Sequence, residues 1–231
     1  MNICVRTCNR AEMARRLVVG LKPHLVTLLV NNCDTSPYRQ ISDRNCQKLM
    51  LDIHGDPLKC SNRAFCYAIN NAKEGEDLLV IDDDTEPCCD FVGKLKRRAS
   101  ALHRVTAEYS RGCFTMNPLY TPARHEHTKY TPLTESQISV AGFKFIRSNW
   151  VDDNIFIPAA LICEFKKWYA TAPKTRANSN GTGYYHSRRM FQKGYPMFTC
   201  VPSLLGHGDH LSIIHPQDRK KYPLIAITHT T

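Results

Sequence analysis

The sequence predicts an α/β fold in which a mixed, mainly parallel sheet is flanked by helices, and three observations support this. Short apolar runs alternate with amphipathic segments over the first 90 residues. These apolar runs end in polar loops, as buried strands of parallel sheets do. The 231 residues suffice for a sizeable core, and we expect a single domain over 1–231.

The first predicted elements are a strand, a helix and a second strand. Residues 2–7 alternate in polarity and predict a strand, and the apolar spacing of residues 12–22 predicts a helix that Pro23 ends. Residues 25–30 are continuously apolar and predict a buried strand leading into a polar loop.

The later elements are less regular along the chain. Ser61 or Asn62 is expected to cap a helix whose buried side carries Ala64, Phe65, Ala68 and Ile69. Residues 78–81 predict the next strand. Beyond residue 93 we expect helices over 94–107, 157–170 and 184–192, and strands within 113–116 and 138–146.

Charge is spread unevenly along the chain, whose formal net charge is +10. Residues 161–231 hold 10 basic and 3 acidic residues, a net of +7, whereas residues 1–160 hold 21 and 18, a net of +3. Such a field favours an anionic partner. A solvated basic face with no partner is the alternative.

Composition excludes several classes of protein. The apolar runs are far shorter than the roughly 20 residues that cross a bilayer, and the first residues show no signal-peptide pattern. The eleven cysteines include no Cys-x-x-Cys pair, which argues against structural zinc. We therefore expect a cytoplasmic protein with reduced thiols and no integral membrane association.

The sharpest chemical signal is the run Asp82-Asp83-Asp84 directly after the apolar residues 78–81. Ligands of open α/β sheets bind at the carboxyl ends of strands. Three adjacent carboxylates repel one another, so we expect them to recruit Mg²⁺ or Mn²⁺, which prefer oxygen ligands. Strand alternation predicts Asp82 and Asp84 on one side and Asp83 on the other. A solvated acidic turn is the structural alternative.

Four segments together resemble GT-A-fold glycosyltransferases that use nucleotide sugars. They are NICVRTCNR at 2–10, VTLLVNNCDTS at 26–36, SNRAFCYAINNAKEGEDLLVIDDD at 61–84 and VPSLLGHGDHLS at 201–212. The resemblance implies a GT-A (Rossmann-like) fold, with residues 1–92 as the nucleotide-sugar-binding half and residues 93–231 as the acceptor-binding half. It also implies metal-dependent transfer of a hexosyl or pentosyl group from a nucleoside diphosphate sugar, foremost a UDP-sugar, to an acceptor hydroxyl.

The resemblance further implies roles for single residues. Asp82 and Asp84 match the Asp-x-Asp positions, where Mn²⁺ or Mg²⁺ bridges the donor diphosphate; Asp84 would be the direct ligand, and Asp82 would lie nearer the ribose or sugar. His207 matches a histidine that completes the metal shell, although it could equally be a surface-loop histidine, and His210 and His215 are its rivals. The donor is expected to contact Thr7, Asn9, Arg10, Asp34, Arg63 and Asp83.

The arginines have a plainer interpretation as surface charges. Arginine suits a diphosphate because it makes bidentate, charge-assisted hydrogen bonds. The surface alternative applies to Arg6, Arg10 and Arg63, and it is the preferred interpretation for Arg15 and Arg16.

One part of the family pattern is missing. Many inverting members carry a carboxylate at the start of a late helix as general base, but residues 182–186 contain none. Asp153 and Asp209 are therefore the candidate catalytic residues, with Asp152 and Glu164 as further acidic neighbours. The stereochemical course stays open.

The acceptor is expected to be anionic, because the half assigned to it carries most of the positive charge. One candidate is a hydroxymethylated base in DNA, modified by a phage-type enzyme in the host cytoplasm, with the base flipped out of the duplex. Another is a glycan or lipid-linked acceptor. A non-enzymatic nucleic-acid-binding protein is the alternative from a different class, and it rests on the basic residues together with Trp168, Tyr169, Tyr184, Tyr185 and Phe191. The three aspartates argue against it.

Overall fold

A nine-stranded sheet runs through the molecule. The computed structural model describes all residues except 32, 120–135, 149–150, 152–153, 171–181 and 208–231. The strand order is β3-β2-β1-β4-β9-β6-β10-β8-β7. The strands are β1 (Asn2–Thr7), β2 (Val26–Val30), β3 (Cys46–Met50), β4 (Leu78–Asp82), β6 (Thr115–Asn117), β7 (Ser136–Val140), β8 (Phe143–Ser148), β9 (Ile155–Ile157) and β10 (Met197–Val201).

The directions of the strands confirm the predicted mixed, mainly parallel sheet. Strands β3, β2, β1 and β4 pair in parallel, as do β6 and β10. Strand β9 is antiparallel to β4 and β6, and β8 is antiparallel to β10 and β7. Two further short strands, β5 (Thr85–Pro87) and β11 (Leu205–His207), form a separate antiparallel pair.

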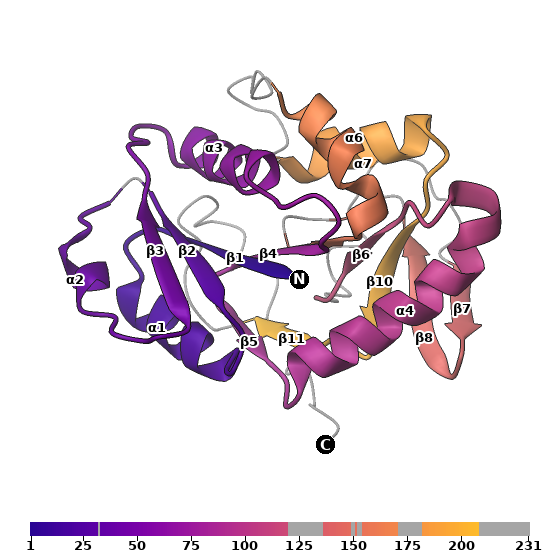
Figure 1. Ribbon diagram of the computed structural model, residues 1–231, viewed down its shortest axis with the longest axis horizontal. Helices are drawn as coiled ribbons and strands as arrows, with labels where there is room; N and C mark the ends of the chain where they lie inside the picture. The colour runs from indigo at the N-terminus through magenta and orange to yellow at the C-terminus, as the bar shows by residue number, and fades with distance from the viewer. Residues whose placement is uncertain (32, 120–135, 149–150, 152–153, 171–181, 208–231) are drawn as a thin grey trace, which may run out of the picture.

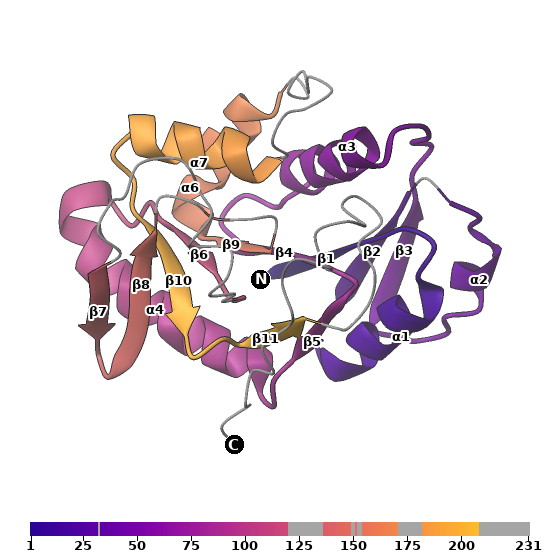
Figure 2. The ribbon, with the colours of Figure 1, turned by 180° about the vertical axis from the view of Figure 1, so that it is seen from behind.

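Helices cover both faces of the sheet (Figures 1 and 2). On one face lie α3 (Pro57–Asn70), α6 (Ala159–Trp168) and α7 (Thr182–Gln192), and on the other lie α1 (Ala11–Gly20) and α4 (Phe91–Ser110). The short α2 (Ser36–Arg39) lies beyond edge strand β3. In the described parts of the chain, none of the helices has both the length and the apolar character that a bilayer crossing requires.

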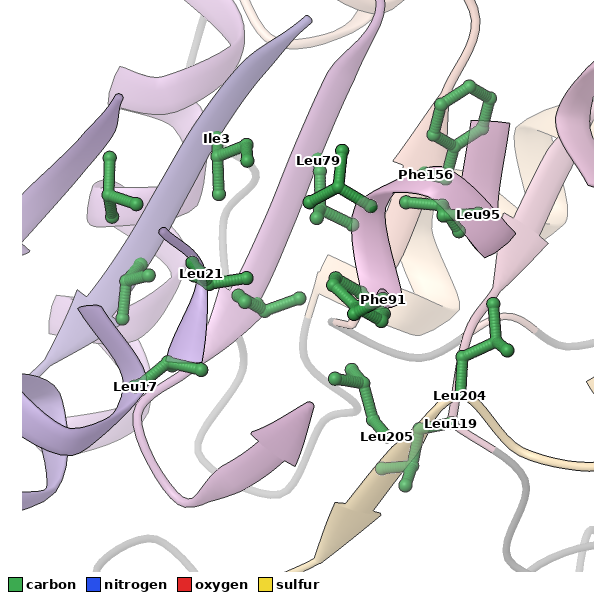
Figure 3. Close-up of a cluster of buried hydrophobic side chains, with 14 of the residues drawn as sticks. Ile3, Leu17, Leu21, Leu79, Phe91, Leu95, Leu119, Phe156, Leu204 and Leu205 are labelled. Carbon is green, nitrogen blue, oxygen red and sulfur yellow. The ribbon is translucent and has the colours of Figure 1, made fainter. Parts of the chain in front are cut away.

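Each face of the sheet has its own hydrophobic core. Ile3 and Leu79 pack into the core on the α1 and α4 side, whereas Cys4 and Val80 pack into the core below α3, α6 and α7. This is the alternation expected of strands buried on both faces. Figure 3 shows the first core, to which α1 contributes Leu17 and α4 contributes Phe91 and Leu95. Two-sided burial fixes the register of β1 and β4, and with it the place where these strands end.

The start of α3 differs from the sequence prediction. The helix begins at Pro57, and Asp56 caps it by accepting a hydrogen bond from the Lys59 amide at 2.9 Å, so the predicted cap at Ser61 or Asn62 is wrong. Asp-Pro is a strong start signal because proline suits the first helical position and aspartate satisfies a free amide. The predicted buried side of this helix is confirmed.

The apolar stretch 138–146 folds as two strands. A turn at Ala141 and Gly142, with φ of 49° and 80°, separates β7 from β8 and makes a hairpin. Strands β3, β5, β9, β10 and β11 were not predicted, and of these β3, β5 and β11 are short or polar runs.

Candidate functional site

The carboxyl ends of three neighbouring parallel strands meet at one edge of the sheet. In the register of β1 with β4, Arg6 lies opposite Asp82, and in that of β1 with β2, Thr7 lies opposite Val30. Past the strand ends, the Asp83 amide donates to the Arg6 carbonyl at 3.2 Å. The loops after β1, β2 and β4 therefore converge where ligands of α/β sheets bind.

Arg6 is the first basic residue of this site. Its Nη2 donates to Asp82 Oδ1 at 2.7 Å, and its Nη1 donates to Ser61 Oγ of α3 at 3.1 Å. The guanidinium carbon lies 5.6 Å from the centre of the Phe65 ring. The Arg6 side chain is only 3% exposed, while that of Asp82 is 34% exposed. The interpretation of Arg6 as a surface charge is therefore wrong, and a charged residue inside an otherwise apolar strand was the available signal.

Arg10 is the second basic residue and lies between the other two aspartates. Its Nη1 is 3.3 Å from Asp83 Oδ1 and 3.0 Å from Asp84 Oδ2. The predicted separation of Asp83 from Asp82 and Asp84 is wrong, since Asp83 and Asp84 share Arg10 while Asp82 pairs with Arg6. Strand alternation does not extend to these residues because β4 ends at Asp82.

Hydroxyl groups connect Asp83 to the neighbouring loops. Thr7 Oγ1 donates to Asp83 Oδ2 at 2.6 Å and also lies 2.9 Å from the Tyr38 hydroxyl. With the Thr7 proton directed at Asp83, the Tyr38 hydroxyl donates to Thr7, and it accepts from the Arg10 amide at 2.8 Å. Sequence reasoning missed Tyr38, whose position on the short α2 depends on the tertiary fold.

Burial shifts the protonation equilibria at this edge. It raises the pKa of Asp83 from 3.8 to about 7, against the opposing effects of the Thr7 hydrogen bond and the Arg10 charge. Burial disfavours the charge of Arg10, but the charges of Asp83 and Asp84 outweigh it and hold the Arg10 pKa above its usual value. Arg10 is therefore firmly cationic beside two carboxyl groups.

The remaining predicted donor contacts are more peripheral. Asn9 is exposed and adopts a left-handed conformation, with φ of 54°, in the loop after β1. Asp34 is exposed after β2 and accepts hydrogen bonds from the amide and hydroxyl of Ser36, which lower its pKa. Arg63 is exposed on α3. The α3 hydroxyl of Ser61, by contrast, accepts a hydrogen bond from the buried Arg6.

The segment predicted to supply a histidine ligand lies beside the aspartates. Strand β11 pairs with β5 so that His207 is opposite Thr85, the residue directly after Asp84. Thr85 Oγ1 also donates to the Asp82 carbonyl at 2.8 Å. The backbone therefore brings together two segments that are more than a hundred residues apart in the sequence.

The residues of this edge fit a divalent cation in their chemistry. Asp82 and Asp84 offer the carboxylate oxygens that Mg²⁺ and Mn²⁺ prefer, and three carboxyl groups here meet two guanidinium groups. Among the described side chains, no three His, Cys, Asp or Glu residues form a group that could hold a metal ion. A metal at this edge would therefore need ligands besides the aspartates, from His207, the donor or water.

Several predicted residues lie elsewhere. Asp152, Asp153, Asp209, His210 and His215 are outside the described residues. Glu164 is on α6 and lies 3.5 Å from Lys167. Arg15 and Arg16 are exposed and pair with Glu12, so the surface interpretation of these two is confirmed.

A second buried polar cluster surrounds His186 and also contacts Phe65. The His186 ring stacks on Phe65 with centroids 5.6 Å apart. Its Nε2 donates to the Val151 carbonyl at 2.8 Å, and its Nδ1 lies 3.1 Å from the Tyr169 hydroxyl. The backbone amide of Thr182 donates to Asn62 Oδ1 at 3.1 Å. These contacts join α3, α6 and α7 within the core.

The basic helices α6 and α7 carry only part of the predicted stacking surface. Trp168 and Tyr169 are buried, which removes them from any nucleic-acid platform. Phe191 is 66% exposed, and the Arg189 guanidinium lies 5.3 Å from the centre of the Tyr185 ring. Arg188 is exposed as well.

Comparisons with known proteins establish the fold. No family model matches the chain, and no curated protein matches it by sequence. Among solved structures, residues 1–349 of TarS from S. aureus superpose with a TM-score of 0.52 and 14% identity, over 90% of this chain and 60% of that one. The fold is GT-A-like. The predicted fold class is therefore confirmed, and the chain spans 60% of the length of this TarS structure. A mannose-1-phosphate geranyltransferase from Thermus thermophilus superposes with a TM-score of 0.41 and 13% identity, over 86% of this chain and 73% of that one.

Proposed function

We propose that this protein transfers a sugar from a nucleoside diphosphate sugar to an acceptor hydroxyl. One observation carries the proposal: three carboxyl groups from the end of β4 meet two arginines at the carboxyl edge of β1, β2 and β4. Clustered charges of both signs at a sheet edge cost desolvation energy and suit a site that binds a charged ligand. The GT-A-like fold agrees with a sugar nucleotide as that ligand.

The loops after β1 and β2 would hold the nucleotide, which we propose to be UDP. Asn9 and Asp34 are exposed at this edge and lie outside the core, so they are available to the base and ribose. Thr7 and Arg10 lie deeper, beside Asp83. Arg10 provides N–H groups that can donate hydrogen bonds to phosphate oxygens. Arg63, on the exposed side of α3, would contact a sugar nucleotide that extends in that direction.

Asp82, Asp84 and His207 would hold Mn²⁺ or Mg²⁺. When bound, such a cation neutralises the charge that develops on the leaving diphosphate. Arg6 orients Asp82 through the 2.7 Å contact, and Ser61 and Phe65 in turn fix Arg6. The carboxylate of Asp82 is thus held in place while still reaching solvent.

We propose Asp153 as the general base, with Asp209 as the second candidate. Asn154, the next residue in the sequence after Asp153, accepts a hydrogen bond from the Asp82 amide at 2.9 Å, and this contact at Asn154 supports the choice of Asp153. Asp209 follows β11 by two residues. Asp153→Asn and Asp209→Asn distinguish the two candidates. Loss of the general base lowers the turnover number and leaves the affinity for the sugar nucleotide unchanged.

For the acceptor we propose an anionic molecule, with DNA that contains hydroxymethylated bases as the first choice. The net +7 of residues 161–231 and the exposed Arg188 and Arg189 support it. Transfer assays on such DNA and on lipid-linked acceptors distinguish the two sources of negative charge.

The function is tested by titration calorimetry with a panel of nucleoside diphosphate sugars, in Mn²⁺ and in EDTA. We expect one donor to bind in Mn²⁺ only, and Asp84→Ala to abolish that binding without loss of the fold. Glu108→Ala is the control, because Glu108 is an exposed carboxylate on α4 and not in a loop at the strand ends. Binding of every donor that is independent of metal and unchanged in Asp84→Ala would overturn the proposal.

A further inference from the structure

Arg10 occupies the space between two carboxyl groups that would otherwise need a cation. A single nitrogen, Nη1, contacts both Asp83 and Asp84, at 3.3 and 3.0 Å. Positive charge at this point is therefore already supplied by the protein chain. A metal ion that binds Asp84 must compete with this guanidinium.

The backbone of Arg10 is anchored independently of its side chain. Its amide donates to the Tyr38 hydroxyl at 2.8 Å, and its carbonyl accepts from the Ala14 amide at 3.0 Å at the start of α1. The side chain makes no capping hydrogen bond to the helix. A cation at a helix N-terminus also gains nothing from the helix dipole. The aspartates, and not the helix, favour this guanidinium position.

The guanidinium of Arg6, unlike that of Arg10, is fixed by several neighbours. It is 3% exposed, pairs with Asp82, donates to Ser61 and lies over Phe65, so strand β4 and helix α3 both hold it. The side chain of Arg10 is 13% exposed, and it forms ion pairs with the two aspartates that follow β4. The guanidinium of Arg10 can therefore move away from the aspartates with less loss of packing than the guanidinium of Arg6 could.

We propose that Arg10 is an exchangeable counter-ion. Its guanidinium neutralises Asp84 while the site lacks a donor, and it turns to the diphosphate when the donor binds, which frees the Asp84 carboxylate for a divalent cation. Metal binding thus becomes conditional on the diphosphate, and by linkage the diphosphate binds more tightly in the presence of metal. This inference rests on the proposed function, since it needs both ligands at this edge.

The test is a Mn²⁺ titration followed by electron paramagnetic resonance, which reports free Mn²⁺ without any turnover. The wild type should bind Mn²⁺ weakly alone and about tenfold more tightly with saturating UDP, a coupling of typical size. Arg10→Met should bind Mn²⁺ about tenfold more tightly than the wild type without UDP, and UDP should strengthen its Mn²⁺ binding by a smaller factor than in the wild type. Arg16→Met is the matched control, because it removes the same charge from an exposed position on the neighbouring helix α1.

Two outcomes separate this inference from the proposed function. Equal Mn²⁺ affinity of the wild type and Arg10→Met without UDP, with UDP strengthening both, would overturn the role of Arg10 and leave the function standing. No Mn²⁺ binding to the wild type even with UDP would overturn both. Arg10→Gln removes the charge through a different side chain and should behave as Arg10→Met does, so it provides the answer if Arg10→Met fails to fold.

Discussion

Two buried polar clusters both contact the Phe65 ring and differ in how their polar groups are paired. The His186 cluster pairs an imidazole with a backbone carbonyl and a tyrosine hydroxyl, all buried and all from the core. The aspartate cluster pairs carboxylates with Arg6 and Arg10 at a sheet edge, where Asp82 still reaches solvent. The polar groups of the His186 cluster pair with one another inside the core, so we interpret that cluster as structural. The charged groups of the aspartate cluster reach solvent at the end of a strand, so we interpret that cluster as a ligand site. Each cluster should therefore respond differently to mutation.

The largest expected effect on stability is at His186. His186→Ala removes the contacts with Val151 and Tyr169 and leaves a cavity between Phe65 and Phe165. We expect the free energy of unfolding to fall by about 3 kcal/mol. Urea denaturation measures it, and donor affinity of the folded variant should stay as in the wild type. Loss of donor binding in folded His186→Ala would remove the distinction between the clusters.

A smaller loss of stability is expected at Arg6. Arg6→Met keeps the apolar stem but leaves Asp82 without its 2.7 Å partner. Because Asp82 reaches solvent, we expect a loss of about 2 kcal/mol, below the usual cost of breaking a fully buried pair. Donor affinity should fall as well, since Asp82 is no longer oriented. Calorimetry and urea denaturation on one preparation check both, and an unchanged donor affinity would show that Arg6 is purely structural.

Burial of Asp83 should make the stability of the protein depend on pH. Its pKa is raised from 3.8 to about 7, so between these values the native state holds a proton that the unfolded state has lost. Stability should therefore fall as pH rises from about 4 to 7 and level off above. Thermal unfolding in EDTA measures this, and Asp83→Asn should remove the dependence. An identical pH profile in the variant would contradict the assignment.

The smallest expected effect on stability is on the basic helices. Replacing Arg188 and Arg189 with Ala should change the free energy of unfolding by no more than about 0.5 kcal/mol, because both are exposed. If DNA is the acceptor, the slope of log affinity against log salt should flatten by roughly 0.9 for each phosphate that the variant no longer neutralises. A filter-binding salt series measures this slope. Salt-insensitive DNA binding would contradict the DNA acceptor.

Much of the fold and part of the site could be predicted from the sequence. The apolar runs that lead to Asp34 and to Asp82-Asp83-Asp84 indicate buried parallel strands, and their polar ends indicate the functional edge. Local patterns could not show that Arg6 faces Asp82, because that pairing depends on the register of two strands 76 residues apart. Tyr38 and the pairing of His207 with Thr85 are likewise products of tertiary packing.

A donor diphosphate and a divalent cation are expected to bind together at the end of β4. A crystal grown with UDP and Mn²⁺, and measured at the manganese absorption edge, tests it most directly. We predict an anomalous peak at coordination distance from the Asp84 carboxylate, with the diphosphate beside it and the Arg10 guanidinium turned to a phosphate oxygen. A manganese peak or a bound nucleotide at another part of the molecule, with Arg10 still between Asp83 and Asp84, would contradict the account.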